Sequence, residues 1–231
     1  MTTMQRKVIF CTPTVTRPFA PFLAAMEASI PLIIEAGWDE GSAYKVGCPY
    51  ISHARSEMTR QALDAKADVI VYIDHDLSWA PGDLLRLIET EGPVVAGTYR
   101  FRKEEEAYMA TIHTYPDHRP VIREDGCIKA DRVPAGFLKI TKEAIHDFME
   151  AYPELIYGPR YNPSIDLFNH GAYQGVWWGE DYGFSRRWGA MGQDIWLVPD
   201  LDITHHNSDQ AFPGNFHQFM MRQPGGCNDG R

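Results

Sequence analysis

The stretch Val69-Ile70-Val71-Tyr72-Ile73-Asp74-His75-Asp76 decides the fold. Its unbroken apolar run, rich in β-branched residues, predicts a strand that is buried on both faces, as in a parallel sheet covered by helices. The run ends in Asp74 and Asp76, whose side chains point to the same side of an extended backbone. Two carboxylates in this arrangement can bind one divalent cation, either both directly or one of them through water. The alternative is a polar turn whose aspartates cap the next helix.

Composition sets the class of protein and excludes several partners. The chain has 231 residues, of which 44% are hydrophobic and 23% are charged, as in an ordinary soluble globular protein. A formal net charge of -9 gives no general attraction to polyanions, so contact with nucleic acid would need local basic clusters. No segment approaches the roughly 20 apolar residues of a membrane span, and the N-terminus lacks a signal-peptide pattern. We therefore expect a cytoplasmic protein without an integral membrane anchor.

Strand-like and helix-like segments alternate along the chain, which is the pattern of an α/β domain with a mostly parallel sheet. Further strands are expected at 7–11, 93–99, 131–140 and 193–200, and the stretch that follows from 201 ends in the pair His205-His206. Helices are expected at 18–36 (with a break or restart at Pro31), 52–67, 84–89 and from 141. Residues 107–133 predict a small antiparallel excursion with Asp125-Gly126 as its turn, and 152–176 predict a long functional loop. We expect one domain over residues 1–223 and a flexible tail over 224–231.

Polar or small residues follow several of the predicted strands. Thr12, Pro13 and Thr14 end the first strand, where they can offer hydroxyl and backbone groups to a ligand or simply form a turn. Arg55 lies in the first turn of a predicted helix, where the helix dipole disfavours a cation. A phosphate or carboxylate partner would explain it, and so would a solvated surface position. Gly136 allows close approach of a ligand or of neighbouring backbone.

A second stretch with candidate catalytic residues begins at Trp177. Glu180 and Asp181 follow a glycine at the start of a helical segment, where they could satisfy free amides or supply a general base that takes a proton from a hydroxyl. His205 and His206 end a late strand, where an imidazole could complete a coordination sphere of carboxylate and phosphate oxygens. The sequence leaves the choice between these two histidines open.

Taken in order, these features resemble the GT-A class of nucleotide-sugar-dependent glycosyltransferases, in particular the family 2 group and its small phage or bacterial relatives. The resemblance covers roughly residues 7–207 and depends on the order and spacing of the motifs. It implies a single GT-A, Rossmann-like domain with a mostly parallel central sheet flanked by helices. It also implies transfer of a sugar, as in hexosyltransferases, from a nucleotide-diphosphate donor, with a UDP-sugar favoured.

The resemblance implies a role for each matching residue. Asp74 and Asp76 would form the family's Asp-x-Asp motif, which binds Mn²⁺ or Mg²⁺ together with the donor diphosphate, with Asp76 as the more direct ligand. His205 would match the late histidine that completes the metal site. Asp181 would match the base of inverting members, and Glu180 would orient the acceptor.

The remaining residues of the resemblance lie on the nucleotide side. Thr12, Pro13, Thr14 and Arg55 would lie against the base, ribose or phosphate of the donor, next to Asp74 and Gly136. Two features depart from the family pattern: His75 stands inside the motif, and Ser56 follows Arg55 where many relatives have asparagine or aspartate. These departures concern the identity of the donor.

Other classes of function share parts of this pattern. A metal-dependent phosphohydrolase or nucleotidyltransferase can also place Asp-x-Asp at a strand end, and a non-catalytic nucleotide-sugar-binding module would keep Asp74 and Asp76 without needing Glu180-Asp181. The acceptor could be a glycan. It could also be a hydroxymethylated pyrimidine in DNA, held by aromatic residues near 173–188 and by the basic residues Arg100, Arg102, Lys103, Arg186 and Arg187.

Overall fold

The computed structural model describes residues 5–223, and its central element is an eight-stranded sheet with the order β2-β1-β3-β8-β5-β13-β7-β6. The strands are β1 (Lys7–Thr14), β2 (Asp39–Val46), β3 (Val69–Ile73), β5 (Val94–Ala96), β6 (Thr111–Ile112), β7 (Ile128–Arg132), β8 (Phe137–Thr141) and β13 (Ile195–Leu197). Strands β7 and β8 run antiparallel to their neighbours, whereas β1 pairs in parallel with β2 and β3, and β5 with β13. The predicted α/β class with a mostly parallel central sheet is therefore confirmed.

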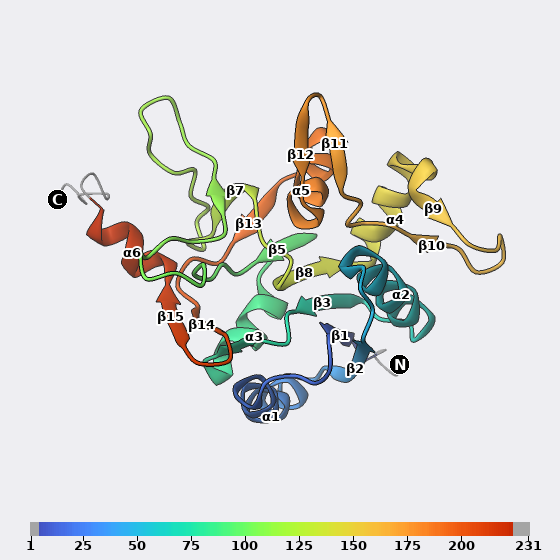
Figure 1. Cartoon of the computed structure of the whole chain (residues 1–231), viewed down its shortest axis with the longest axis horizontal. Helices are drawn as coiled ribbons and strands as arrows, with labels where there is room; N and C mark the ends of the chain where they lie inside the picture. The colour runs from blue at the N-terminus through green and yellow to red at the C-terminus, as the bar shows by residue number, and fades with distance from the viewer. Residues whose placement is uncertain (1–4, 224–231) are drawn as a thin grey trace.

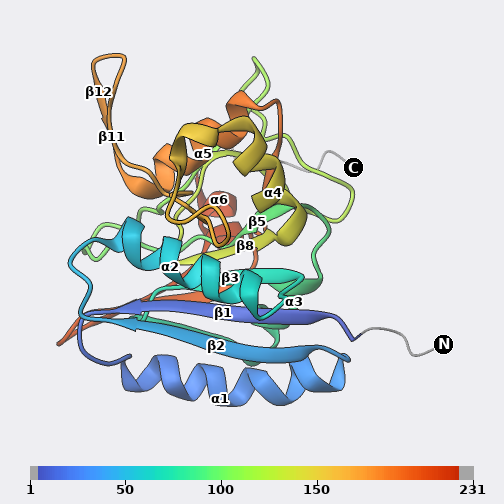
Figure 2. The same cartoon turned by 90° about the vertical axis from the view of Figure 1, so that its right-hand side faces the viewer.

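Helices cover both faces of this sheet (Figures 1 and 2). Alternation along β3 sends Ile70 and Tyr72 to one hydrophobic cluster and Val71 and Ile73 to the other, as expected of a strand buried on both faces. The second cluster is closed by α1 (Ala20–Glu35) and α3 (Pro81–Glu89). The first cluster is closed by α2 (Ile51–Asp64), α4 (Lys142–Ala151) and α5 (Glu180–Ala190).

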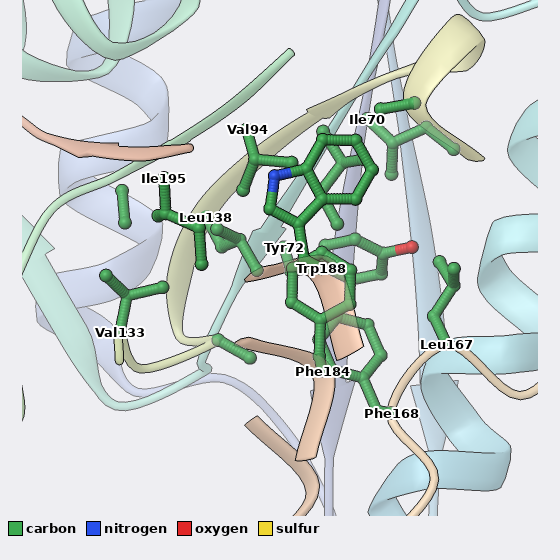
Figure 3. Packing of buried hydrophobic residues seen from close by; sticks show 14 of the residues in the cluster. Ile70, Tyr72, Val94, Val133, Leu138, Leu167, Phe168, Phe184, Trp188 and Ile195 are labelled. Atoms are coloured by element: carbon green, nitrogen blue, oxygen red, sulfur yellow. The ribbon is translucent and has the colours of Figure 1, made fainter. Parts of the chain in front are cut away.

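A row of aromatic side chains attaches α5 to the sheet (Figure 3). Tyr72 of β3 meets Phe168 edge to face with ring centroids 5.0 Å apart, and Phe168 in turn lies 5.4 Å from Phe184. Phe184 stacks on Trp188 one turn further along α5, at 6.2 Å. Because these rings are fully buried, they fix the start of α5, and with it Glu180, relative to the end of β3.

Three small sheets lie outside the central one. Strands β4 (Leu77–Trp79), β14 (Asp202–His206) and β15 (Ala211–Asn215) form an antiparallel sheet, which is followed by α6 (Phe216–Arg222). Strands β9 (Ile156–Tyr157) and β10 (Ser164–Ile165) pair after the short 3₁₀ helix η1 (Pro153–Leu155), and β11 (Gly171–Tyr173) pairs with β12 (Val176–Trp178) in a hairpin. The β4–β14 pairing brings the end of β14, with His205 and His206, against Asp76.

The structure differs from several sequence expectations. Helix α1 continues through Pro31, because that residue is on the exposed side, where water can satisfy the carbonyl that the proline leaves unbonded. The strand expected at 131–140 is two strands, because the chain turns at Pro134-Ala135-Gly136 between β7 and β8, which are not neighbours in the sheet. The loop expected at 152–176 contains β9, β10 and β11.

Two further expectations concern the ends of the chain and the membrane. The tail predicted at 224–231 lies outside the described residues, as do residues 1–4. Over residues 5–223, none of the helices is both long enough and apolar enough to cross a bilayer.

Candidate functional site

A cavity of about 490 Å³ opens at the carboxyl ends of β1 and β3, the edge of an α/β sheet where ligands generally bind. Its wall includes residues that the sequence singled out together with several that it did not, namely Pro13, Thr14, Val15, Lys45, Gly47, Cys48, Pro49, Ile51, Asp74, His75, Asp76, Tyr99, Arg102, Met109 and His205. This size is typical of pockets that hold a small molecule. The structure therefore brings Asp74, Asp76 and His205 to one cavity.

Asp76 and His205 meet at the floor of this cavity. Nε2 of His205 lies 3.7 Å from Oδ2 of Asp76, and both side chains are nearly buried. Nδ1 of His205 donates to the carbonyl oxygen of Arg100 at 2.8 Å, which leaves Nε2 as the acceptor nitrogen of the ring. Burial lowers the pKa of His205, so the neutral imidazole that a metal requires is favoured.

His206 faces away from Asp76. Its Nε2 lies 2.8 Å from the Ser78 hydroxyl, and its backbone N–H donates to the Asp76 carbonyl oxygen at 2.8 Å. Adjacent residues of β14 point to opposite sides, so only one of the two histidines can face the cavity. His205 is the one that lines the cavity, whereas the sequence left the choice between the two histidines open.

Arg102 lies where a cation between Asp76 and His205 would lie. Its Nη2 forms an ion pair with Oδ2 of Asp76, and its Nε donates to Nε2 of His205 at 2.9 Å. Over residues 5–223, no three or more His, Cys, Asp or Glu side chains form a group that could hold a metal ion. A buried carboxylate and an anchored imidazole nevertheless fit a Mg²⁺ or Mn²⁺ that takes its other ligands from substrate phosphates and water.

Asp74 faces Arg55, which is the most deeply buried charged residue of the site. The Arg55 side chain is 2% exposed, and its Nη2 donates to Oδ1 of Asp74 at 2.9 Å. Its Nη1 donates to Oε1 of Glu180 at 3.1 Å, and its guanidinium lies over the Phe168 ring. Arg55 therefore joins the two acidic motifs that the sequence showed separately, and carboxylate partners account for a buried cation near the start of α2.

Asp181 follows Glu180 at the start of α5 and is more deeply buried than an ordinary surface carboxylate. Its Oδ1 accepts from the Tyr182 N–H at 2.7 Å. Burial, and after it the adjacent charge of Glu180, raise the pKa of Asp181 to about 6, against the opposing effect of Arg55. A carboxylate with a pKa near the working pH is suited to general-base catalysis.

The Thr12-Pro13-Thr14 segment is the end of β1 rather than a loop. Pro13 and Thr14 line the cavity, and the Thr14 Oγ1 is buried without a hydrogen-bond partner among the described residues, so it is free to bond a ligand. Thr12 is buried and does not line the cavity. Lys45 of the neighbouring strand β2 also lines the cavity. It had no signal in the sequence, because only the β1–β2 register places it beside Pro13.

His75 has a structural explanation. Its ring meets Phe19 edge to face, with centroids 5.6 Å apart, and it donates a hydrogen bond to the backbone of Pro13. The backbone carbonyl of His75 also accepts from the Phe19 N–H at 2.9 Å. His75 thus fastens the end of β3 to the segment that leads from β1 into α1.

Gly136 supports Asp74 by close approach. The Asp74 N–H donates to the Gly136 carbonyl oxygen at 2.9 Å, and the Tyr99 hydroxyl donates to Oδ2 of Asp74 at 3.3 Å. A Cβ atom on Gly136 would overlap both the Tyr99 hydroxyl and the Asp74 carboxylate, and would lie 2.7 Å from Asp74 Cγ. Tyr99 had no signal in the sequence beyond its position as the last residue of a predicted strand.

We expect Gly136→Ala to displace the Asp74 side chain and to destabilise the fold by about 1–3 kcal/mol through overpacking. A thermal-melting comparison checks this, with a fall of several degrees expected for a chain of this size. Gly82→Ala is the matched control, because a Cβ there meets nothing within 4 Å. Equal melting temperatures for the two variants would show that the site tolerates the extra methyl group.

Comparisons with known proteins bear on the fold. No protein-family model matches the chain, and no curated protein does. Among solved structures, A197 from STIV aligns over 91% of this chain and 94% of its own, with 15% identity and a TM-score of 0.50. GalNAc-T7 with UDP, GalNAc and Mn²⁺ aligns over 89% of this chain and 44% of its own, with 11% identity and a TM-score of 0.45.

A third solved structure is a glycosyltransferase involved in glycosylation of the major capsid of PBCV-1. It aligns over 64% of this chain and 66% of its own, with 12% identity and a TM-score of 0.34. The solved structures that resemble the chain thus include a glycosyltransferase. Of these three structures, A197 from STIV has the TM-score of 0.50, and at 15% identity it establishes a similarity of fold alone, so the activity has to be argued from the site.

Proposed function

We propose that the chain is a metal-dependent glycosyltransferase that moves a sugar from a nucleotide-diphosphate donor, preferably a UDP-sugar, to a hydroxyl acceptor with inversion. The observation that carries this proposal is the ion-pair chain Asp74–Arg55–Glu180. It connects Asp74 of the small-molecule cavity to Glu180, and the next residue, Asp181, is a carboxylate whose pKa is raised to about 6. The donor sugar and the acceptor hydroxyl would meet between the cavity and Asp181.

The donor would occupy the cavity at the ends of β1 and β3. Thr14 would bond it through the hydroxyl that lacks a protein partner, and Pro13 would pack against it. Asp76 and His205 would hold the divalent cation directly, and Asp74 would act through water because Arg55 already engages one of its oxygens. When bound, such a cation neutralises the charge that develops on a departing diphosphate.

Asp181 would take the proton from the acceptor hydroxyl. A hydroxyl attacks poorly while it keeps its proton, so a carboxylate within hydrogen-bond reach on the face of the sugar opposite the diphosphate promotes in-line displacement and inversion. Glu180 would orient the acceptor through the oxygen that Arg55 leaves free. The anomeric configuration of the product, measured by NMR, tests this assignment, since retention would exclude Asp181 as the base.

A donor-hydrolysis screen with and without Mn²⁺ tests the function itself. Slow, metal-dependent release of UDP or GDP from a nucleotide sugar without an acceptor would support a glycosyltransferase. Release of inorganic phosphate or pyrophosphate would support a phosphohydrolase or nucleotidyltransferase instead. Tight binding of the nucleotide sugar with no turnover, even when a range of acceptors is offered, would point to a binding module.

Arg102 gives the metal assignment a test that needs no turnover. Its guanidinium occupies both groups that the cation would use, so we expect Arg102→Gln to tighten Mn²⁺ binding about tenfold, the worth of one charge-assisted hydrogen bond. Calorimetric titration with Mn²⁺ alone measures the affinity. Lys103→Gln is the control, since that neighbouring cation pairs with Glu105 instead. Unchanged or weaker binding by the Arg102 variant would remove Asp76 and His205 from the metal site.

A further inference from the structure

Two arginines beside α5 stack on aromatic rings. The Arg186 guanidinium carbon lies 3.9 Å from the centroid of the Tyr173 ring and 5.5 Å from that of Trp178. The Arg132 guanidinium carbon lies 4.9 Å from the centroid of the same Trp178 ring and 5.6 Å from that of Tyr182. We call these five residues the arginine–aromatic stack. They come from β7, α5 and the β11–β12 hairpin, so the stack is a product of the tertiary fold.

Neither arginine of the stack has a carboxylate partner. Among the described residues no hydrogen bond or ion pair joins a carboxylate to Arg132 or Arg186, and the Arg186 Nε is buried without any partner. Most other arginines of the chain pair with an aspartate or a glutamate, as Arg55, Arg86 and Arg222 do. Two positive charges are thus held in place with their neutralisation left to a ligand.

The stacking also decides how such a ligand would be bound. Aromatic rings cover the flat faces of the two guanidiniums, so the N–H groups at their edges remain available to donate. Edge donors in a fixed plane match the oxygens of a phosphate or carboxylate, and pre-organisation lowers the entropy lost on binding. The geometry therefore suits an anion more than a neutral hydroxyl group.

The stack lies next to the acid pair that the proposed function uses. Trp178 and Tyr182 flank Glu180 and Asp181 in the chain, and the hairpin that carries Tyr173 projects from the body of the molecule near α5 (Figures 1 and 2). Trp177, on the same hairpin, is 71% exposed and offers a further flat apolar surface. An anion on the stack would therefore be bound near the start of α5, the turn that carries both Tyr182 and Asp181.

We propose that the acceptor carries a phosphate group next to a ring, and that Arg132 and Arg186 bind this phosphate. The inference rests on the proposed function, since it names the class of molecule that Asp181 would deprotonate. Two guanidiniums match the charge of one phosphate better than that of one carboxylate. The net charge of -9 opposes a long polyanion, so the site takes one or two phosphates rather than an extended nucleic acid strand.

Phenyl phosphate, which combines one phosphate with one ring, is a suitable probe. Its affinity is measured by ligand-observed NMR titration without donor or metal, with benzyl alcohol as the uncharged comparison. We expect Arg132→Gln/Arg186→Gln to bind phenyl phosphate at least tenfold more weakly than the wild type. The double variant Arg6→Gln/Arg60→Gln removes the same charge from arginines that pair with Glu89 and Asp64, and its affinity should match the wild type.

Three outcomes would overturn the proposal. Equal phenyl phosphate affinity in the wild type and the stack variant, with both folded by circular dichroism, would remove the arginines from binding. Equal affinity of the wild type for benzyl alcohol and phenyl phosphate would remove the phosphate. Affinity for oligothymidylates that rises from two to ten nucleotides, with a salt slope indicating more than two phosphates, would assign the stack to a nucleic acid strand.

This test is independent of the proposed function. It measures binding without turnover, whereas donor hydrolysis measures turnover without an acceptor. A protein that binds phenyl phosphate through the stack but hydrolyses no nucleotide sugar would retain the anion site and lose the glycosyltransferase assignment. A protein with metal-dependent donor hydrolysis and no phosphate binding would retain the enzyme and lose the acceptor class.

Discussion

Replacing Asp181 with asparagine should lower turnover about 10²–10⁴-fold while leaving donor binding within a few-fold of the wild type. General-base assistance is worth about this much, and the amide of asparagine cannot take a proton from the acceptor. Asp181 does not line the donor cavity, so the affinity for the nucleotide should depend on it little. The measurements are the rate of transfer to a hydroxyl acceptor and calorimetric binding of UDP.

The raised pKa of Asp181 predicts the direction in which activity changes with pH. The pKa of Asp181 is about 6 in the folded protein, and the base must be ionised to work, so kcat/KM should fall as the pH drops through about 6. Because Glu180 is the second cause of the raised pKa, Glu180→Gln should move this acid limb to lower pH. An acid limb at the same pH in the wild type and in Glu180→Gln would show that Glu180 does not influence the titration of Asp181.

Asp83→Asn is the matched control for the asparagine substitution. Asp83 also lies in the first turn of a helix, and burial also raises its pKa, but it accepts a hydrogen bond from the Asp202 backbone and does not line the donor cavity. Its replacement should affect stability and leave the rate of transfer intact. A comparable loss of turnover in the two variants would mean that helix-start charges matter here for folding rather than catalysis.

The parts of the site that the sequence predicted are those with a local cause. An unbroken apolar run rich in β-branched residues placed β3 and therefore Asp74, and the glycine before Glu180 placed the start of α5. The contact of Asp76 with His205 has no local cause. It depends on the pairing of β4 with β14, and β4 is a three-residue strand that immediately follows the motif and reads as a turn.

The sequence also could not identify which groups pair with the charged residues. The sequence showed that Arg55 opposed the helix dipole and left an anionic partner and a solvated surface position both open. Glu180 is 125 positions away, so nothing local could identify it. The arginine–aromatic stack is a similar case, because its residues come from elements that are adjacent only in the folded chain. Patterns of one or two residues indicated the candidate site residues, whereas tertiary contacts decided which of them lie together.

Replacing Arg55 with methionine should destabilise the protein by about 3 kcal/mol, at the lower end of the cost of breaking a buried ion pair. The side chain of Arg55 is 2% exposed, whereas those of Asp74 and Glu180 are 25% and 28% exposed, so water can partly solvate the carboxylates that lose their partner. Urea unfolding measures the change. Arg60→Met, one turn along the same helix, removes a more exposed pair with Asp64 and should cost less than about 1 kcal/mol.

Arg55 should also matter for function beyond its contribution to stability. Its positive charge lowers the pKa of Asp181, so its loss should move the acid limb of kcat/KM to higher pH. Arg55→Lys keeps the charge, but a single ammonium group lacks the guanidinium fork whose two arms reach Asp74 and Glu180. We therefore expect the lysine variant to keep the limb near its wild-type position and still lose turnover, because a correct charge does not restore the geometry between the two carboxylates. Full activity in the lysine variant would reduce Arg55 to a source of charge, and an unfolding free energy for Arg55→Met no lower than that of Arg60→Met would remove its structural role as well.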